Sequence, residues 1–292
     1  MTAQTEASIA PALATWRRVF SQLMSALAAG CAVVVIAALA LLLAYVVRRG
    51  GGALSWTFLT SLPAPVGEAG GGIGNAIVGT LELVALASCV GLPIGIASGI
   101  YLAEADRGAL RGAVRFAADV LAAVPSIVVG VFAYTLVVLP THHFSALAGA
   151  IALAVMMIPT AARSTEEVLR LVPRTLREAA LALGVPEWKT TMRIILPSAR
   201  SGLVTGALLA VARVAGETAP LLFTAFGSRL WSVKPTEPVA SLPTQIYTYA
   251  ISPYDDWQSQ AWGAALVLTV LVLALNLASR YIVGARSPKA GR

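Results

Sequence analysis

Residues 120–162 read VLAAVPSIVVGVFAYTLVVLPTHHFSALAGAIALAVMMIPTAA, and none of them carries a formal charge. As one helix this stretch would be roughly 65 Å long, about twice the thickness of a bilayer core. It is therefore expected to form two spans, residues 117–139 and 144–162, that meet at the sequence Pro-Thr-His-His. A chain with this feature is expected to lie in a membrane.

The composition of the whole chain supports the same class. Of its 292 residues, 58% are hydrophobic and only 12% are charged, whereas ordinary soluble domains have about 25% charged residues. So few charges cannot cover the surface of a water-soluble globule. The net charge of +7 is spread over short loops between apolar runs, which fits membrane orientation and predicts no nucleic-acid partner.

Four more apolar runs complete an all-α, polytopic membrane protein with six transmembrane helices over residues 26–283. These runs are residues 26–47, 73–102, 201–226 and 261–283. The first run is too long for the apolar core of a signal peptide, and no small-residue cleavage site follows it. Four prolines are expected to interrupt spanning helices: Pro93, Pro125, Pro159 and Pro220.

The distribution of basic residues predicts an N-in, C-in orientation with cytoplasmic tails at 1–25 and 284–292. The other side of the membrane then carries only Arg48, Arg49, Arg229 and Lys234. The Arg48 and Arg49 pair is an exception to the rule. Two segments are long enough to meet soluble partners, the inner loop 163–200 and the outer loop 227–260.

The inner loop has strong helix signals. Pro173 is typical of a first helical turn, and RTLREAALAL at 174–183 favours a helix that ends at Gly184. A second short helix is expected at 187–195, ending before Pro197. Such an element can carry a push from a partner protein into the fifth span, although a solvated amphipathic connector fits the composition equally well.

This loop resembles the EAA motif of the ABC-importer permeases. The residues that match the motif at its fixed spacing are Glu178, Ala179, Ala180, Gly184, Ile194, Ile195, Leu196 and Pro197. In that family the motif forms a coupling helix that docks on a separate ATPase subunit. The resemblance implies the same role for residues 178–184, and a type I importer permease fold.

Other segments resemble phosphate-specific permeases of the PstA type. They are GIGNAIVGTLEL (72–83), VPSIVVG (124–130), VARVAGETAPLLFTA (211–225) and SLPTQIYTYA (241–250). The resemblance covers roughly residues 72–281. It implies one half of the path of a phosphate importer in a bacterial plasma membrane, paired with a second permease, two ATPase subunits and an external phosphate-binding protein.

The chain has no phosphate-binding loop of its own. Of its lysines only Lys189 precedes a threonine, and the residue before it is Trp188 rather than glycine, so the P-loop pattern is missing. The chain is therefore expected to be no enzyme and to hold no cofactor or metal. ATP and magnesium would bind to the partner subunits.

Two charges fall inside the predicted fifth span. Arg213 and Glu217 are four residues apart, which predicts one helix face. Each would cost roughly 2.5–3.5 kcal/mol at the bilayer centre, and their pairing returns only about 0.2–0.5 kcal/mol in water. A guanidinium offers donors matched to an oxyanion, so a substrate role is favoured over a helix-locking ion pair; the resemblance implies that role as well.

Weaker candidates lie in other spans. Glu82 either lines the path or bonds to a neighbouring helix. Ser126 follows a proline whose freed backbone groups can face a path. Asp119 is expected to be an interfacial cap, and Cys31 and Cys89 are expected to be packing residues.

Three other functions remain open at this point. The first is a permease for another oxyanion, such as sulfate or molybdate. The second is a gradient-driven transporter with Glu217 and Glu82 as a proton relay. The third, an intramembrane hydrolase, would need a nucleophile and a base at matching depth, and the sequence offers no such pair.

Overall fold

The computed structural model describes residues 3–68, 70–105 and 108–284. Residues 285–292 of the predicted C-terminal tail lie outside that range. Every regular element in the described residues is a helix, and extended segments pair only at two isolated bridges. The chain divides into two compact units, Met1–Arg49 and Gly50–Arg292.

The first unit is the helix α1 (Ala3–Gly50). Its apolar part is long enough to cross a membrane and contains the predicted span 26–47. The helix runs without a break from Ala3 through the residues predicted as an N-terminal tail.

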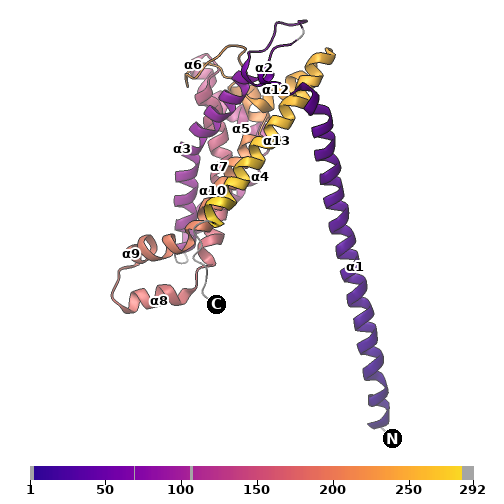
Figure 1. The fold of residues 1–292 in the computed structure, drawn as a ribbon. Helices are drawn as coiled ribbons and strands as arrows, with labels where there is room; N and C mark the ends of the chain where they lie inside the picture. The colour runs from indigo at the N-terminus through magenta and orange to yellow at the C-terminus, as the bar shows by residue number, and fades with distance from the viewer. Residues whose placement is uncertain (1–2, 69, 106–107, 285–292) are drawn as a thin grey trace. The chain divides into compact units, whose positions relative to one another are not determined.

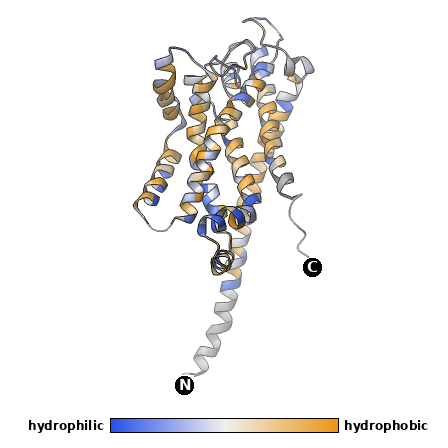
Figure 2. Cartoon of the chain, turned by 90° about the vertical axis from the view of Figure 1, so that its left-hand side faces the viewer, coloured by the Kyte–Doolittle hydropathy of each residue, from blue (hydrophilic) through white to orange (hydrophobic). Residues whose placement is uncertain are grey.

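The second unit contains four long helices. They are α3 (Gly74–Glu104), α7 (Ala146–Arg170), α10 (Leu196–Ala215) and α13 (Asp255–Gly284). Figure 1 shows α8 and α9 at one end of this bundle, and α2 and α12 at the other. Figure 2 shows apolar residues along the middle of the long helices and hydrophilic residues gathered towards the ends.

Short helices connect the long ones. They are η1 (Gly51–Ala53), α2 (Trp56–Thr60), α4 (Ala109–Ala123), α5 (Ser126–Ala133), η2 (Tyr134–Val138), α6 (Leu139–Thr141), α8 (Arg174–Ala182), α9 (Glu187–Thr190), η3 (Thr191–Ile195), α11 (Ala219–Thr224) and α12 (Leu242–Ala250). Five helices of the described residues can span a membrane by length and composition, or six if the bent pair from α4 to α6 is one span. The all-α, multi-span fold is confirmed.

Close packing of α3 on α7 forms the centre of the bundle. Gly91, Gly95 and Gly99 recur every four residues on one face of α3, which is the spacing that lets two helices approach closely. A Cβ atom added at Gly99 would lie 2.4 Å from the carbonyl oxygen of Ala162 on α7. The two backbones therefore lie so close that a side chain larger than glycine would not fit between them.

The predicted third span, 117–139, is wrong as a straight helix. α4 starts earlier, at Ala109, and α4 and the helix that begins at Ser126 are bent by 102°. The break falls at Val124, whose ψ of 129° is extended. The following Pro125 disfavours the α conformation at the residue before it, which explains the position of the bend.

Pro93 and Pro159 do not interrupt their helices as expected. Each lies inside a continuous helix, α3 and α7 respectively. Helices in membranes tolerate proline because neighbouring helices and local adjustments compensate for the missing hydrogen bond.

The fifth span also differs from its predicted bounds. The short helix expected to stop before Pro197 instead continues through η3 into α10, where the backbone N–H of Leu196 donates to the carbonyl of Thr191, five residues back. This wider turn is a π-helical one. α10 then ends at Ala215, well before residue 226, and Gly216 starts a break that precedes α11.

The two cysteines are not packing residues. Cys31 on α1 and Cys89 on α3 are both exposed, and neither forms a disulfide.

Candidate functional site

The inner loop folds around α8 as the sequence predicts. The helix runs from Arg174 to Ala182 and is followed by Gly184, whose φ of +76° lies in the left-handed region that favours glycine. The backbone N–H of Val185 donates to the carbonyl of Ala180 at 3.1 Å and closes the turn. The prediction of a helix that ends at this glycine is confirmed.

The motif residues divide into an exposed and a buried set. Glu178 and Ala179 are exposed on α8, whereas Ala180 is buried against the turn. The second half of the motif contributes to a buried cluster at the foot of α7 and α10. Its members are Leu169, Ile195 and Ala199, with Leu196 packed against them; Ile194 is half-buried and Pro197 is exposed. The motif therefore presents α8 to solvent and anchors the start of α10.

One carboxylate that the sequence analysis did not select lies beside this loop. Glu104, the last residue of α3, accepts hydrogen bonds from both terminal guanidinium nitrogens of Arg177 on α8. The Nη2–Oε1 distance is 2.5 Å. The Thr191 hydroxyl in η3 donates to Oε2 of the same carboxylate at 2.7 Å. In the sequence Glu104 is one of several charges in the short loop after the second span, so nothing singles it out.

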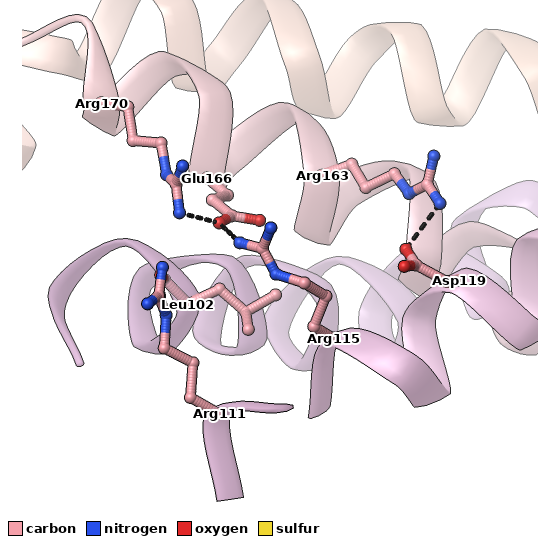
Figure 3. A network of polar contacts seen from close by, with 7 residues as sticks. All are labelled: Leu102, Arg111, Arg115, Asp119, Arg163, Glu166 and Arg170. Carbon is pink, nitrogen blue, oxygen red and sulfur yellow. Dashed lines mark hydrogen bonds and ion pairs between the residues drawn. The ribbon is translucent and has the colours of Figure 1, made fainter. Parts of the chain in front are cut away.

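A second polar network joins α4 to α7 at the same end of the bundle. Arg115 of α4 and Arg170 of α7 both point at the Glu166 carboxylate, and the Arg170 Nη2–Oε1 distance is 2.6 Å (Figure 3). Asp119 forms an ion pair with Arg163 at 2.6 Å (Figure 3). Asp119 therefore lies inside α4 in an ion pair and does not cap this helix, which begins at Ala109. Its position at the membrane interface stays a prediction.

This network encloses open space. A cavity of about 300 Å³ lies between α4 and α7, and Arg115, Asp119, Arg163 and Glu166 are among its lining residues. Arg111 of α4 donates its Nε hydrogen to the carbonyl of Leu102 at 3.2 Å and so reaches the end of α3. The inner end of the bundle thus holds a dense set of arginines that face carboxylates and backbone carbonyls.

Arg213 and Glu217 do not lie on one helix, which corrects the sequence prediction. Arg213 is in the last turn of α10 and is exposed, whereas its neighbours Ala212 and Val214 are buried. Glu217 lies in the break after Gly216 and is half-buried. The described residues show no ion pair or hydrogen bond between them. The exposed Arg213 side chain thus has no ion-pair partner among the described residues.

Glu82 lies on α3, and both of its carboxylate oxygens are buried without a hydrogen-bond partner within the described residues. Ser126 is half-buried at the first position of α5, which packs on α11. No hydrogen bond or ion pair among the described residues joins any two of the four predicted pathway residues, Arg213, Glu217, Glu82 and Ser126.

The outer loop contains an aromatic cluster around α12. The rings of Tyr249 and Trp257 are stacked with centroids 4.5 Å apart, and the Arg229 guanidinium lies 5.6 Å above the Trp257 ring. Burial raises the pKa of the Tyr249 hydroxyl above its ordinary value. These residues line a cavity of about 210 Å³ that also reaches Thr244 and Gln245.

Three comparisons with known proteins bear on this arrangement. The model of the family described as "Binding-protein-dependent transport system inner membrane component" matches residues 91–292. A protein from Yersinia pestis named phosphate transport system permease protein PstA is 48% identical over 237 residues, which cover 81% of this chain and 80% of that protein. A Haemophilus influenzae protein of the same name is 43% identical over 267 residues, covering 91% and 94% of the two chains.

A solved structure has the same fold. A chain of the MetNI methionine ABC transporter, in an inward-facing conformation, superimposes with a TM-score of 0.62 at 22% identity. The match covers 74% of this chain and 98% of that one.

Proposed function

The chain belongs to the family of binding-protein-dependent transport system inner membrane components, and from this we propose that it is the permease subunit of an ATP-driven importer of inorganic phosphate. The observation that carries the proposal is the identity of 43–48% to phosphate transport permeases over most of the chain. Members of this family are components of the inner membrane. The five or six candidate spans of the described residues agree with that location.

Arg213 is the residue that we assign to the substrate. It is an exposed guanidinium at the end of a spanning helix, where this chain's own residues do not neutralise it by an ion pair within the described range. The fork of donors matches two oxygens of a phosphate, and a dry environment strengthens such charge-assisted bonds. Glu217, in the break beyond Gly216, would balance the guanidinium when no anion is bound.

The proposed partners are those that the resemblance to ABC-importer permeases implies, and the family to which the chain belongs supports them. Two ATPase subunits, which bind ATP and magnesium, would dock on the inner loop 163–200 through Glu178 and the residues near it. A second, similar permease would complete the path beside Arg213, and an external phosphate-binding protein would dock on the outer loop 227–260. The subunit itself would hold no cofactor and make or break no bond.

The first test is purification from the native membrane in mild detergent, followed by phosphate-stimulated ATP hydrolysis. Recovery of an ATPase and a second permease, with activity that depends on the phosphate-binding protein, supports the proposal. Uptake that survives removal of the ATPase but collapses with an uncoupler would favour the proton-relay transporter instead. Competition by sulfate or molybdate would point to another oxyanion.

The second test is the substitution Arg213→Gln. We expect it to lower phosphate uptake by about a hundredfold, since one charge-assisted hydrogen bond to an oxyanion contributes roughly 1.5–3 kcal/mol. Arg48→Gln removes a guanidinium from the end of α1 and is the matched control, with uptake unchanged. If Arg213→Gln prevented assembly of the complex, Arg213 would be a helix-locking residue rather than a substrate ligand.

A further inference from the structure

We infer that Glu104 is a positioning residue that joins α8 to both α3 and α10, so that a displacement of α8 by an ATPase subunit moves these two spanning helices together. The inference rests on the proposed function in one respect, the presence of an ATPase at α8.

The contacts of Glu104 connect three separate segments. Arg177 of α8 donates hydrogen bonds to both carboxylate oxygens, and the hydroxyl of Thr191 in η3 donates to one of them. The Arg177 and Glu104 side chains are 35% and 18% exposed, so the carboxylate is largely shielded from water while the guanidinium is partly screened by it. A guanidinium that holds both oxygens of a carboxylate fixes orientation as well as distance. This geometry transmits a rotation of α8 as well as a translation.

The ion pair is needed because α8 is otherwise held only weakly. A cavity of about 580 Å³ separates one face of α8 from the ends of α3 and α7, with Ala103, Leu169, Arg174 and Leu181 among its lining residues. Ala180 is the one buried residue of α8. In the described part of the chain, Arg177 is the only α8 side chain with a hydrogen bond or ion pair to another helix.

The helices beyond Glu104 are suited to receive the displacement. α3 cannot slide on α7 because Gly91, Gly95 and Gly99 bring the two backbones into contact, so the pair responds as one body. η3 continues into α10, whose last turn carries Arg213. One carboxylate therefore links the exposed loop to the α3–α7 pair and to the helix that carries the proposed substrate residue.

The test uses the assembled complex in proteoliposomes with Arg177→Gln and Glu104→Gln. Three quantities are measured: the yield of complex, the rate of ATP hydrolysis, and the phosphate transported per ATP. We expect yield and hydrolysis to persist, while transport per ATP falls by roughly tenfold or more, as for loss of a charge-assisted hydrogen bond. Arg177→Lys keeps the charge but cannot contact both carboxylate oxygens at once. Its transport per ATP should lie between the values of the wild type and of Arg177→Gln.

Two further variants separate the ion pair from the loss of a positive charge as such. Arg48→Gln removes a guanidinium at the end of α1, outside the inner loop, so transport per ATP should stay at the wild-type value. The double variant Glu104→Arg with Arg177→Glu restores the pair in reverse and should recover part of the lost transport. A defect as large in Arg48→Gln as in Arg177→Gln, or a double variant no better than Arg177→Gln, would overturn the inference.

A second readout does not depend on the substrate. A label on the exposed Cys89 of α3, in a Cys31→Ser background, should change its signal when ATP and vanadate are added to the wild type, and lose that change in Arg177→Gln. A wild type without a Cys89 response, or an Arg177→Gln variant with a full one, would overturn the inference. A complex that shows the expected Cys89 pattern but moves no phosphate would overturn the proposed function alone.

Discussion

At the scale of single residues, Gly95 shows how closely the two central helices are fitted. A Cβ atom at this position would lie 2.6 Å from the Cβ of Ala161 and 2.9 Å from the carbonyl oxygen of Ile158. Neither contact can be relieved by rotating a side chain. Gly112 on α4 has nothing within 4 Å of its added Cβ atom.

We therefore expect Gly95→Val to lower the free energy of unfolding by about 1–3 kcal/mol through overpacking, measured by thermal unfolding of the purified protein in detergent. Gly112→Val is the matched control, because it makes the same change in a helix with open space and should have a small effect. Equal losses in the two variants would show that helix propensity rather than close packing sets the cost.

Glu82 presents the opposite situation, a carboxyl group with no partner in the described residues. A carboxylate buried without a partner is destabilising, so Glu82→Gln, which keeps the shape and removes the charge, should lower the free energy of unfolding by less than the roughly 0.5–1.5 kcal/mol that one hydrogen bond contributes. Thermal unfolding and the yield of assembled complex measure this. A marked loss of stability would reveal a partner for Glu82 on another subunit.

At the scale of elements, the contacts between α4 and α7 differ in strength. Glu166 is 10% exposed at its side chain and contacts two arginines, whereas the side chains of Asp119 and Arg163 are each 51% exposed. Solvent screens the second pair much more than the first. The Glu166 cluster should therefore hold α4 against α7.

Glu166→Gln is expected to lower the free energy of unfolding by about 1–2 kcal/mol, after allowance for the partly exposed arginines. Asp119→Asn should cost less than about 1 kcal/mol. The comparison can be made by denaturant unfolding of the two variants in the same detergent. The reverse order would mean that the exposed pair, and not the Glu166 cluster, fastens α4.

The helices themselves could be predicted from the sequence, whereas their bends could not. A long run without charged residues predicts a spanning helix. Gly184 predicts a helix end because the left-handed conformation that ends a helix depends on the glycine itself and not on distant parts of the chain. Proline is ambiguous: Pro125 ends a helix while Pro93 and Pro159 do not, because neighbouring helices decide whether a lost hydrogen bond is tolerated. The separation of Arg213 and Glu217 was missed since Gly216 gives no stronger signal than glycines inside α3.

The site was predictable only where a motif was continuous along the chain. Glu178 and Gly184 lie six positions apart in one continuous motif, so the pattern can be recognised in the sequence. Glu104 and Arg177 come from segments 73 residues apart, and no local pattern joins an acidic residue at the end of one span to an arginine in a later loop. Such pairs are settled by the packing of α3 on α7.

At the scale of the whole molecule, many large apolar side chains remain exposed on the second unit. Val90 and Ile94 on α3, and Val270, Leu273 and Leu277 on α13, are about half exposed or more. In a soluble protein this would cause aggregation. In a bilayer such faces meet lipid, which agrees with the inner-membrane family to which the chain belongs.

The distribution of basic residues predicts that the loop 227–260 lies outside the cell and that α8 lies in the cytoplasm. In a background of Cys31→Ser and Cys89→Ser, Val233→Cys in the outer loop should react with a membrane-impermeant maleimide added to intact cells. Thr175→Cys on α8 should react only after the membrane is opened. Both positions are exposed, so a reversed pattern would mean that the chain is inserted the other way round.

The π-helical turn at Thr191–Ile195 has a consequence for the length of this segment. A π turn holds one residue more than an α turn. Deleting one residue there would convert it to an α turn and rotate everything upstream by about 100° relative to α10. The Thr191 hydroxyl would then leave Glu104, and α8 would point elsewhere. The spacing between the motif glycine and Arg213 should therefore tolerate neither insertion nor deletion, even though most loops do.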